Sequence, residues 1–522
     1  MGQDQNYPEP NFSENTDDAT GPCYPAALFS PTCVVNQFVN VQDDHAEVAR
    51  EVAMEAVTLL MNEDNALPLS NSSTLFVFGT DAGNNTGGLN SCSDQGCDNG
   101  YLGMGWGSGS ASYPFADAPI DALKAYAKDV TFYDSDTYPS GLAPTATDIA
   151  LVFINADSGE NYITVEGNPG DRTVSNLNAW HNGDALVEAA AAQFSTVVVV
   201  IHTVGPILLD AWIDLPSVKA VVNAHLPGQA AGTSLAPVLF GAISPSGHLP
   251  YTIPQSESQY PASVGLVYFE FGQPQDTYSE GLYIDYRYFD KNRIAPRFAF
   301  GHGLSYTNFS YTDATITSIT QMATTPPAAS TGRGTTQSSY SQSIPPASEA
   351  VWPTGFNSLL NYLYPWLTAS QADSAAAAAS TSTYPYPEGY STTAHAVSPA
   401  SGGEGGNPAL WDIAYNVSVK VTNTGAVSGK AVAQLYVSFP SGISYDTLVK
   451  QLRDFAKTDT LAPGASQVLV MSVTRKDLSV WDVESQNWVI PSISGSYSLS
   501  VGAASDDLRV TCSTDGSCTS TD

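Results

Sequence analysis

The sequence predicts an α/β domain with a parallel sheet, followed by an all-β sandwich that a long loop interrupts. Between about residues 45 and 312, near-continuous apolar strands alternate with helical segments, as in a parallel sheet that helices cover on both faces. Residues 415–425 and 431–439 instead alternate with period two and are bounded by turns, which is typical of a β-sandwich. The change of hydrophobic period therefore indicates two domains of different class.

The α/β domain is expected to begin with a helix. From Asp44 onward, apolar residues recur at helical spacing: Val48, Val52, Ala56 and Leu59/Leu60. Apolar runs then predict strands at residues 75–79, 149–155, 196–202 and 218–224, with helices at 119–128, 184–194 and 229–240. In such sheets ligands bind beyond the carboxyl ends of the strands, so the loops that follow the strands are the candidates for a site.

Composition divides the whole chain into five parts. Residues 1–44 are rich in Pro, Asn and Asp and are expected to be a connector, and residues 45–312 form the α/β domain. Residues 313–320 and 409–510 form the sandwich, and residues 511–522 form a C-terminal tail. Ser, Thr, Ala and Pro dominate residues 321–408, which indicates a low-complexity insertion, either a solvated loop or an O-glycosylated segment. Residues 361–367 are too aromatic for a free linker and are expected to dock on a neighbouring surface.

The charge of the chain excludes two classes of partner. The 522 residues include 51 acidic and 18 basic side chains, which give a formal net charge of −33. Nucleic acid and anionic membranes need a partner that neutralises negative charge, so neither is expected to bind. The sequence contains no transmembrane run, and residues 1–12 lack the apolar segment of a signal peptide.

The six cysteines fall into three close pairs, and local clustering favours disulfides within each pair. Zinc is the competing interpretation, but no histidine lies near any pair and the spacings are not those of zinc ligands, so no metal is expected. The expected pairs are Cys23–Cys33, Cys92–Cys97 and Cys512–Cys518.

Disulfides indicate an oxidising compartment, and five Asn-x-Ser/Thr sequons are in keeping with a secreted glycoprotein. The sequons lie at Asn11, Asn71, Asn84, Asn308 and Asn416. Oxidising chemistry without a signal peptide is contradictory, and loss of an N-terminal part would resolve the contradiction.

The loop after the strand at 149–155 carries the strongest candidate for chemistry. It presents one carboxylate, Glu160, beside one aromatic ring, Tyr162. A carboxyl group held against an apolar surface has a raised pKa and can keep a proton until it gives it to a leaving sugar oxygen. The loop after the strand at 75–79 contains the Gly/Ser-rich motif GWGSGS with Ser108, and topology places both loops at one edge of the sheet.

Several long motifs, in order over nearly the whole chain, resemble the C-terminal portion of fungal β-glucosidases of glycoside hydrolase family 3. They begin with NQFVNVQDDHAEVAREVAMEAVTLLMNEDNALPL at residue 36, followed by CSDQGCDNGYLGMGWGSGSASYP (92–114) and NADSGENYITVEGNPGDR (155–172). LPGQAAGTSLAPVLFGAISPSGHLPYTI (226–253), EGLYIDYRYFD (280–290) and FAFGHGLSYTNFSY (298–311) continue the match.

The resemblance implies a role for three residues. Glu160 corresponds to the general acid/base, Tyr162 to an aromatic side chain at the site entrance, and Ser108 to a hydroxyl near the bound sugar. The second domain would be fibronectin type III-like, with the long segment inserted after its first strand. No cofactor is implied, and a homodimer is left open.

The family also carries an N-terminal (β/α)8 barrel that supplies a nucleophilic Asp, usually in a Ser-Asp-Trp motif. This chain contains no Ser-Asp-Trp and has no room for a barrel of about 250 residues before the resemblance begins. We therefore expect a truncated, extracellular β-glucosidase that acts on β-linked glucosides or cello-oligosaccharides, has the missing barrel domain as a partner, and is inactive as this chain alone.

Other polar residues, the motif GWGSGS and the function of the chain each have a competing interpretation. Glu166 is expected to shape a turn, Asp171 and Arg172 to form a structural ion pair, and His181, His202 and His225 to be structural, because retaining glycosidases use two carboxylates. GWGSGS lacks the lysine of a P-loop and the spacing of a dinucleotide motif, so nucleotide binding is rejected. A non-catalytic carbohydrate-binding or accessory fragment is the competing class, and β-xylosidase is the competing activity within the family.

Overall fold

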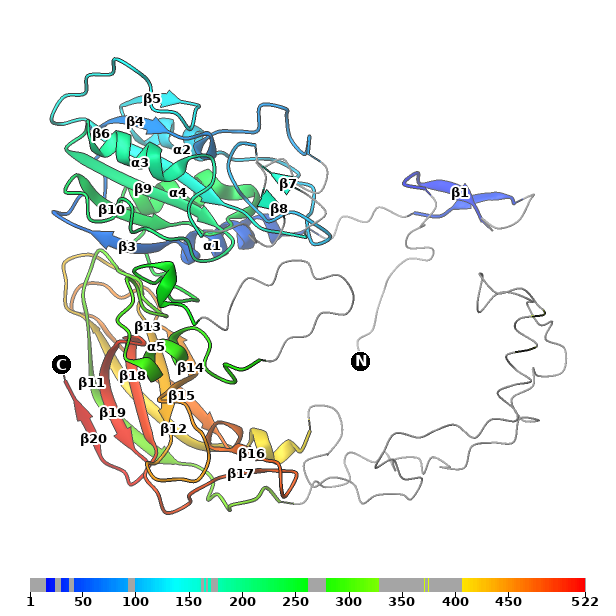
Figure 1. Ribbon diagram of the computed structural model, residues 1–522, viewed down its shortest axis with the longest axis vertical. Helices are drawn as coiled ribbons and strands as arrows, with labels where there is room; N and C mark the ends of the chain where they lie inside the picture. The colour runs from blue at the N-terminus through cyan, green and yellow to red at the C-terminus, as the bar shows by residue number, and fades with distance from the viewer. Residues whose placement is uncertain are drawn as a thin grey trace.

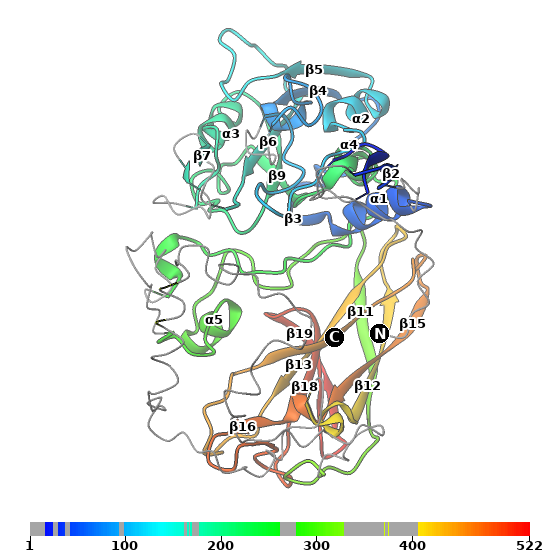
Figure 2. The ribbon, with the colours of Figure 1, turned by 90° about the vertical axis from the view of Figure 1, so that its right-hand side faces the viewer.

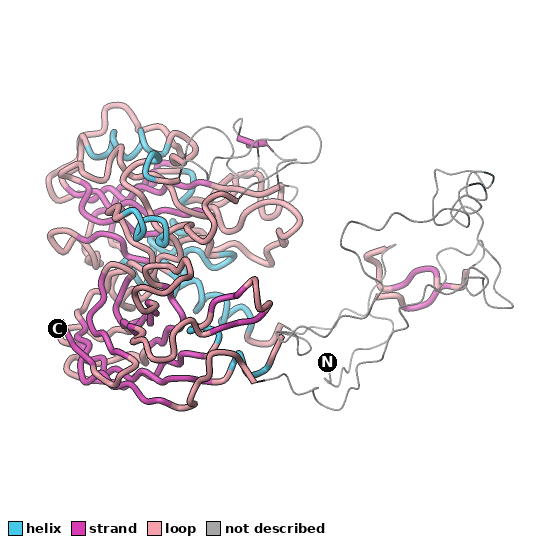
Figure 3. Tube along the Cα trace, turned by 60° about the horizontal axis from the view of Figure 1, so that its bottom comes forward, coloured by secondary structure: helices cyan, strands magenta, loops and turns pink. Residues whose placement is uncertain are grey.

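The computed structural model of the chain describes residues 16–23, 30–36, 42–92, 99–160, 177–261, 278–327 and 406–521. Outside these ranges it describes Ser370, Ser374 and the backbone of two short strands, β7 (Thr164–Val165) and β8 (Asn168–Pro169). The residues form an α/β body that is stacked on a β-sandwich (Figure 1). Helices and strands alternate in the first body, whereas strands dominate the second (Figure 3).

The α/β body contains a six-stranded sheet with the order β3-β10-β9-β6-β4-β5. The strands are β3 (Thr58–Asn62), β4 (Thr74–Phe78), β5 (Asp129–Tyr133), β6 (Ile149–Ala156), β9 (Thr196–Thr203) and β10 (Val218–Asn223). The helices are α1 (His45–Ala56), α2 (Pro119–Tyr126), α3 (Gly183–Ala191) and α4 (Ala231–Leu239). The expected α/β class is confirmed, although the sheet is mixed, because β3 runs antiparallel to β10 at one edge.

Both faces of the sheet are buried, which explains the continuous apolar strands. On β6, Val152 and Ile154 belong to the core under α3, whereas Leu151 and Phe153 belong to the opposite core under α2 and α4. Successive side chains of a strand point to opposite faces, so a strand between two cores must be apolar at every position.

The helix expected from residue 44 ends earlier than its pattern indicated. α1 ends at Ala56, and Leu59 and Leu60 lie in β3, where they face the two opposite cores. Val48 and Val52 were expected on the buried face of this helix, but they are 48% and 64% exposed. The prediction was wrong because a short apolar run buried on both faces has the same composition as one turn of a buried helix.

The second body is a β-sandwich of two antiparallel sheets, with strand orders β11-β12-β15 and β14-β13-β18-β19-β20. These strands are β11 (Phe309–Ser318), β12 (Ile413–Asn423), β13 (Val432–Ser438), β14 (Gln451–Lys457), β15 (Ser466–Thr474), β18 (Ser498–Ala504), β19 (Asp507–Ser513) and β20 (Cys518–Ser520). The insertion leaves after β11, as expected, but the aromatic stretch 361–367 lies outside the described residues.

Two expected boundaries differ from the structure. β11 begins at Phe309, before the expected end of the α/β domain at 312. The expected tail is part of the sandwich, because β19 and β20 pair with each other and extend the five-stranded sheet. Short elements complete the fold: the hairpin β1 (Thr20–Pro22) with β2 (Thr32–Val34), the hairpin β16 (Val480–Asp482) with β17 (Asn487–Val489), and α5 (Tyr286–Asn292).

The cysteine pairs have three different outcomes. Cys512 and Cys518 form the expected disulfide across β19 and β20, with an S–S distance of 2.04 Å. Cys92 is also disulfide-bonded, but its expected partner Cys97 lies outside the described residues. Cys23 and Cys33 are free thiols in the structure, so this expected bond is not present. A hydrogen bond joins the two thiols and raises the pKa of Cys33, so the pair is adjacent without being covalently linked.

Lysines of the sandwich make charged contacts with α1 and α5. α1 lies on the side of the α/β body that faces the sandwich, and α5 lies beside the sandwich (Figure 2). The carboxylate of Glu55 on α1 accepts hydrogen bonds from Lys430, which precedes β13, and from Lys457 on β14, the latter over 2.7 Å. Asp290 on α5 pairs in the same way with Lys450, over 2.6 Å. Burial alone would raise the pKa of Glu55, but the hydrogen bonds and charges of the two lysines outweigh burial and hold it below its usual value.

We predict that Glu55→Gln destabilises the chain by roughly 1 kcal/mol at pH 7, the upper range for a partly exposed ion pair. A carboxyl whose pKa is depressed in the folded state stabilises the protein above its unfolded pKa, and this contribution disappears as the pH falls through the folded pKa. The difference from wild type in urea unfolding should therefore be present at pH 7 and should disappear as the pH falls through and below the usual range of a glutamate carboxyl.

The matched control is Glu47→Gln. Glu47 is also on α1, but it pairs only with Arg50 of the same helix and its side chain is 74% exposed. An equal loss of stability in both variants would show that the Glu55 contact between the two bodies contributes nothing specific.

Candidate active site

The candidate site lies at the edge of the sheet where the parallel strands end. β4, β6, β9 and β10 are parallel, so their carboxyl ends lie on the same side of the domain. Glu160 follows β6, and Ser108 belongs to the loop between β4 and α2. The topology expected from the sequence is confirmed, and it brings together two residues that are 52 positions apart.

Ser108 holds the carboxylate of Glu160 directly. The backbone N–H of Ser108 donates to Glu160 Oε2 over 2.6 Å, and its hydroxyl donates to the same oxygen over 2.7 Å. Both side chains are exposed, so the carboxylate is fixed yet open to a ligand. The third expected residue, Tyr162, lies outside the described residues, as do Glu166, Asp171 and Arg172.

Trp106 fixes the backbone of the same glutamate. Its indole N–H donates to the carbonyl oxygen of Glu160 over 2.9 Å, and its ring packs against Trp180 with the centroids 5.6 Å apart. Trp106 is 4% exposed, so the contact is shielded from water. The sequence analysis did not identify this residue, although a tryptophan between two glycines in a polar loop is an available signal.

The glycines of both loops are needed for this close approach. Gly107 has φ +106°, and a Cβ at this position would lie 2.7 Å from Glu160 Oε2. A Cβ at Gly159 would lie 2.2 Å from the Trp106 ring. The motifs GWGSGS and SGEN are therefore two halves of one contact.

The electrostatics of Glu160 differ from the expectation for a proton donor. The two hydrogen bonds from Ser108 stabilise the ionised form and lower the pKa of Glu160 below its usual value. The sequence predicted a raised pKa, which requires an apolar surface or a second carboxylate close by. Neither contributes here within the described part of the chain, where burial of Glu160 has only a minor effect. The contacts with Ser108 favour the ionised form of Glu160, which suits a general base rather than a proton donor.

A buried polar cluster lies beneath these loops. Asp81, in the turn after β4, lies 2.7 Å from His202 Nδ1 at the end of β9. It also accepts hydrogen bonds from the Leu102 N–H and from the amide of Asn155 at the end of β6. Burial raises the pKa of Asp81, and the charge of His202 opposes this rise. The sequence analysis did not identify Asp81 or Asn155.

The other histidine at this edge is half-buried. His225, at the end of β10, contacts the hydroxyl of Thr58 through Nε2 over 3.1 Å. Burial, with a smaller contribution from His202, lowers the pKa of His225 to about 4. A neutral, half-buried imidazole agrees with the structural role expected from the sequence.

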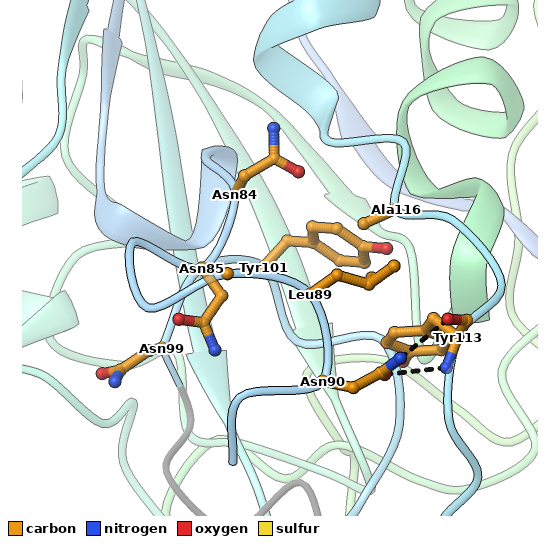
Figure 4. Close-up of a pocket in the computed structure, with 9 residues that line it drawn as sticks. Asn84, Asn85, Leu89, Asn90, Asn99, Tyr101, Tyr113 and Ala116 are labelled. Atoms are coloured by element: carbon orange, nitrogen blue, oxygen red, sulfur yellow. Dashed lines mark hydrogen bonds between the residues drawn. The ribbon is translucent and has the colours of Figure 1, made fainter.

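A polar pocket of about 300 Å³ lies in the loop between β4 and α2 (Figure 4). Its amide groups hold the loop itself: the Asn90 side chain donates to the carbonyl of Tyr113 and accepts from its N–H, each over 2.8 Å. The lining residues are Asn84, Asn85, Gly88, Leu89, Asn90, Asn99, Tyr101, Tyr113 and Ala116.

Three further expectations concern metal ligands, membrane-spanning helices and glycosylation sequons. Among the described residues, no three His, Cys, Asp or Glu side chains gather as metal ligands would, and no helix is long and apolar enough to cross a membrane. Asn71, Asn84 and Asn308 are exposed, and Asn11 lies outside the described residues. Asn416 is half-buried in β12, where its side-chain oxygen accepts from the Ser472 hydroxyl.

Comparison with known proteins identifies both domains. Residues 57–306 match the family described as Glycosyl hydrolase family 3 C-terminal domain, and residues 431–505 match the Fibronectin type III-like domain. The chain is 56% identical over 512 residues to the "Probable beta-glucosidase F" of Aspergillus flavus, covering 98% of this chain and 59% of that protein. It is 41% identical over 504 residues to "Beta-glucosidase 1" of Aspergillus aculeatus, covering 94% of this chain and 57% of that protein.

Solved structures give the same result. A glycoside hydrolase family 3 β-glucosidase from Neurospora crassa superposes with a TM-score of 0.79 at 35% identity, covering 96% of this chain and 60% of that one. The β-D-glucoside glucohydrolase of Trichoderma reesei gives 0.70 at 38% identity, covering 93% and 57%. The chain thus spans less than two thirds of the length of the relatives that it matches.

We predict that Ser108→Ala raises the pKa of Glu160, because the variant loses one of the two hydrogen bonds that stabilise the carboxylate. The pKa is measured from the side-chain carboxyl ¹³C shift in selectively labelled protein, with Glu160→Gln to assign the resonance. Ser110→Ala in the same loop is the control and should leave the pKa unchanged. An unchanged pKa in Ser108→Ala would show that the hydroxyl does not stabilise the charge.

Gly159→Ala is predicted to destabilise the chain by about 1–3 kcal/mol, because the added methyl group overlaps the Trp106 ring. The indole N–H resonance of Trp106 should also shift as its hydrogen bond to Glu160 breaks. Gly109→Ala is the matched control in the facing loop, since a Cβ there meets no atom within 4 Å. Equal effects in the two variants would contradict the proposed contact.

Proposed function

The chain belongs to glycoside hydrolase family 3, and from this premise we propose that it forms the acid/base-bearing part of a retaining β-glucosidase. The proposed reaction is the hydrolysis of terminal, non-reducing β-D-glucosyl residues in cellobiose and other β-glucosides. The observation that carries the proposal is the exposed Glu160 carboxylate, which Ser108 and Trp106 hold at the carboxyl edge of the sheet.

A retaining glycosidase needs two carboxyl groups about 5 Å apart. One attacks the anomeric carbon and the other protonates the leaving oxygen, then activates water to release the sugar. Glu160 is proposed for the second role. Since no carboxylate of the described residues contributes to its pKa shift, the nucleophile is proposed to come from a barrel domain that these 522 residues do not contain.

The lowered pKa of Glu160 suits one of the two steps. In the second step Glu160 must be ionised to take a proton from water, and the two hydrogen bonds from Ser108 favour that state. In the first step it must carry a proton. A neighbouring nucleophilic carboxylate and the exclusion of water would raise its pKa until the glycosyl–enzyme bond forms and the nucleophile becomes neutral.

Ser108 is proposed to serve both the acid and the sugar. Its hydroxyl donates to Glu160 in the described state, and a hydroxyl also has two acceptor positions. When Glu160 is protonated, the Ser108 hydroxyl no longer faces a charge and can donate to a sugar hydroxyl instead. Tyr162 is proposed to line the entrance.

The sugar that is hydrolysed is proposed from the relatives, and the compartment from the disulfide and the glycosylation sequons. The names of the relatives favour glucose over xylose at the non-reducing end. The Cys512–Cys518 disulfide and the exposed sequons support secretion, so an extracellular protein is proposed.

The test is hydrolysis of 4-nitrophenyl β-D-glucoside by the 522-residue chain and by a longer protein in which a family 3 barrel precedes it. The chain alone is expected to be inactive, because no glycosyl–enzyme intermediate can form without the nucleophile. In the longer protein, Glu160→Ala should lower the rate by about 10²–10⁴-fold, the usual contribution of a general acid/base.

Azide should restore turnover of the Glu160→Ala variant on a substrate with a good leaving group, with β-glucosyl azide as the product. Glu257→Ala, an exposed glutamate elsewhere in the same domain, is the control and should retain wild-type activity. Turnover by the isolated chain near the rate of the longer protein would refute the missing nucleophile, and failure of azide rescue would count against Glu160 as acid/base.

A further inference from the structure

We propose that Asp81 is the positioning residue of this site. Its single buried carboxylate holds the loop of Ser108 and the loop of Glu160 to the ends of the parallel strands, with His202 as its charged or hydrogen-bonding counterpart. The proposal rests on the proposed function of Glu160 for its catalytic meaning, but the placement of Asp81 stands on its own contacts.

One oxygen of Asp81 joins the loop of Ser108 to the end of β6, the strand that leads to Glu160. Oδ1 accepts from the N–H of Leu102 over 2.8 Å and from the side-chain amide of Asn155 over 3.2 Å. Leu102 precedes Ser108 by six residues, and Asn155 precedes Glu160 by five. The Ser108 loop, which meets Glu160 through Ser108 and Trp106, is therefore also tied at its base to the strand from which the Glu160 loop begins.

The second oxygen of Asp81 fixes the direction of the carboxylate. Oδ2 lies 2.7 Å from Nδ1 of His202, which ends β9. Asp81 is 2% exposed and His202 is 0% exposed. The Asp81 carboxylate is thus connected to three strand ends, since it follows β4 itself and contacts residues at the ends of β6 and β9.

Stability alone does not account for such a pair. Taking a carboxylate and an imidazole out of water lowers the stability of the folded state, and apolar residues of similar volume commonly stabilise a core as well or better. The His202 Nε2 atom and the Asn155 Oδ1 atom are buried without a hydrogen-bond partner among the described residues, which adds to this cost. The buried Asp81 carboxylate lowers stability, but its one oxygen fixes the Ser108 loop to the end of β6. A positioning role accounts for this arrangement.

The loop is anchored on its other side as well. The N–H of Gly228 donates to the carbonyl of Gly103 over 2.8 Å, so residues 102 and 103 are held by Asp81 on one side and by the segment after β10 on the other. From this fixed point the chain runs through Trp106 to Ser108. Loss of the Asp81 contact would free the base of the loop and lengthen the Ser108–Glu160 hydrogen bonds.

The first test measures the pKa of Glu160 in the full 522-residue chain by carboxyl ¹³C NMR. Asp81→Ala is expected to raise this pKa in the same direction as Ser108→Ala, because Ser108 would no longer be held against the carboxylate. The matched control is Asp136→Ala. Asp136 accepts hydrogen bonds from the N–H and the hydroxyl of Thr80, next to Asp81, but none from either loop.

The control separates positioning from folding. Asp136→Ala should lower the unfolding temperature and leave the pKa of Glu160 unchanged. If Asp81→Ala does not fold, Asp81→Leu is the second variant. Its apolar side chain has a similar size but cannot accept the hydrogen bonds of Leu102 and Asn155, so the pKa of Glu160 should again rise. A folded Asp81 variant with the wild-type pKa of Glu160, or equal shifts in the Asp136 control, would overturn the proposal.

The second test uses activity in the barrel-containing protein and compares leaving groups. A misplaced acid matters most when the leaving group needs a proton. Asp81→Ala should therefore lower kcat/KM by about 10–100-fold for cellobiose, in the range that a displacement of 1 Å can cause. For 2,4-dinitrophenyl β-D-glucoside the loss should be several-fold smaller.

The two tests distinguish the failure of the two proposals. Equal losses on both substrates would contradict a positioning role toward the acid. If Glu160→Ala retained full activity, the proposed function would fail, while the NMR result would still report whether Asp81 holds the Ser108–Glu160 contact.

Discussion

The site depends on one constraint: four parallel strands must end at the same edge of a sheet that is buried on both faces. β4, β6, β9 and β10 are apolar through most of their length, and polar residues follow near their carboxyl ends. Asp81, Asn155, His202 and His225 occupy these positions. Because the strands are parallel, residues far apart in sequence arrive together without a binding motif that is continuous along the chain.

Glu160 is subject to two opposing demands. A proton donor needs a surrounding that disfavours charge, whereas the N–H and hydroxyl of Ser108 favour charge. Both hydrogen bonds from Ser108 reach the same oxygen, Oε2, and the side chain of Glu160 is exposed. The geometry is therefore set by this chain, while the protonation state depends on what approaches the exposed side of the carboxylate.

The sequence predicted the elements that depend on local pattern. The apolar runs of β6 and β9 were found within one or two residues, because strands buried on both faces are apolar along their central residues, with polar residues only near their ends. The run at Leu59 and Leu60 was assigned to a helix, since only pairing with β10 distinguishes it as a strand. Glu160 and Ser108 were predicted as site residues from their motifs, but the motifs did not predict the direct contact between them.

The residues that the sequence did not reveal act over long distances. Asp81 and Asn155 contact each other across 74 positions, and Trp106 reaches Glu160 across 54. Their residue types are unremarkable for a loop, so no local signal separates them from turn residues. The disulfide at Cys23 and Cys33 was expected from spacing, which gives proximity but does not decide whether the sulfur atoms are bonded.

The packing of the two bodies determines which side of the α/β domain is open. β3 would be an exposed edge strand, but Leu304 pairs with Leu59 and the segment that leads to β11 runs along it. Glu55 then ties α1 to the sandwich through Lys430 and Lys457. The sandwich is thus attached along the β3 and α1 side of the sheet (Figure 2). Glu160 and Ser108 take no part in these contacts, so the attachment of the sandwich leaves their hydrogen bonds untouched.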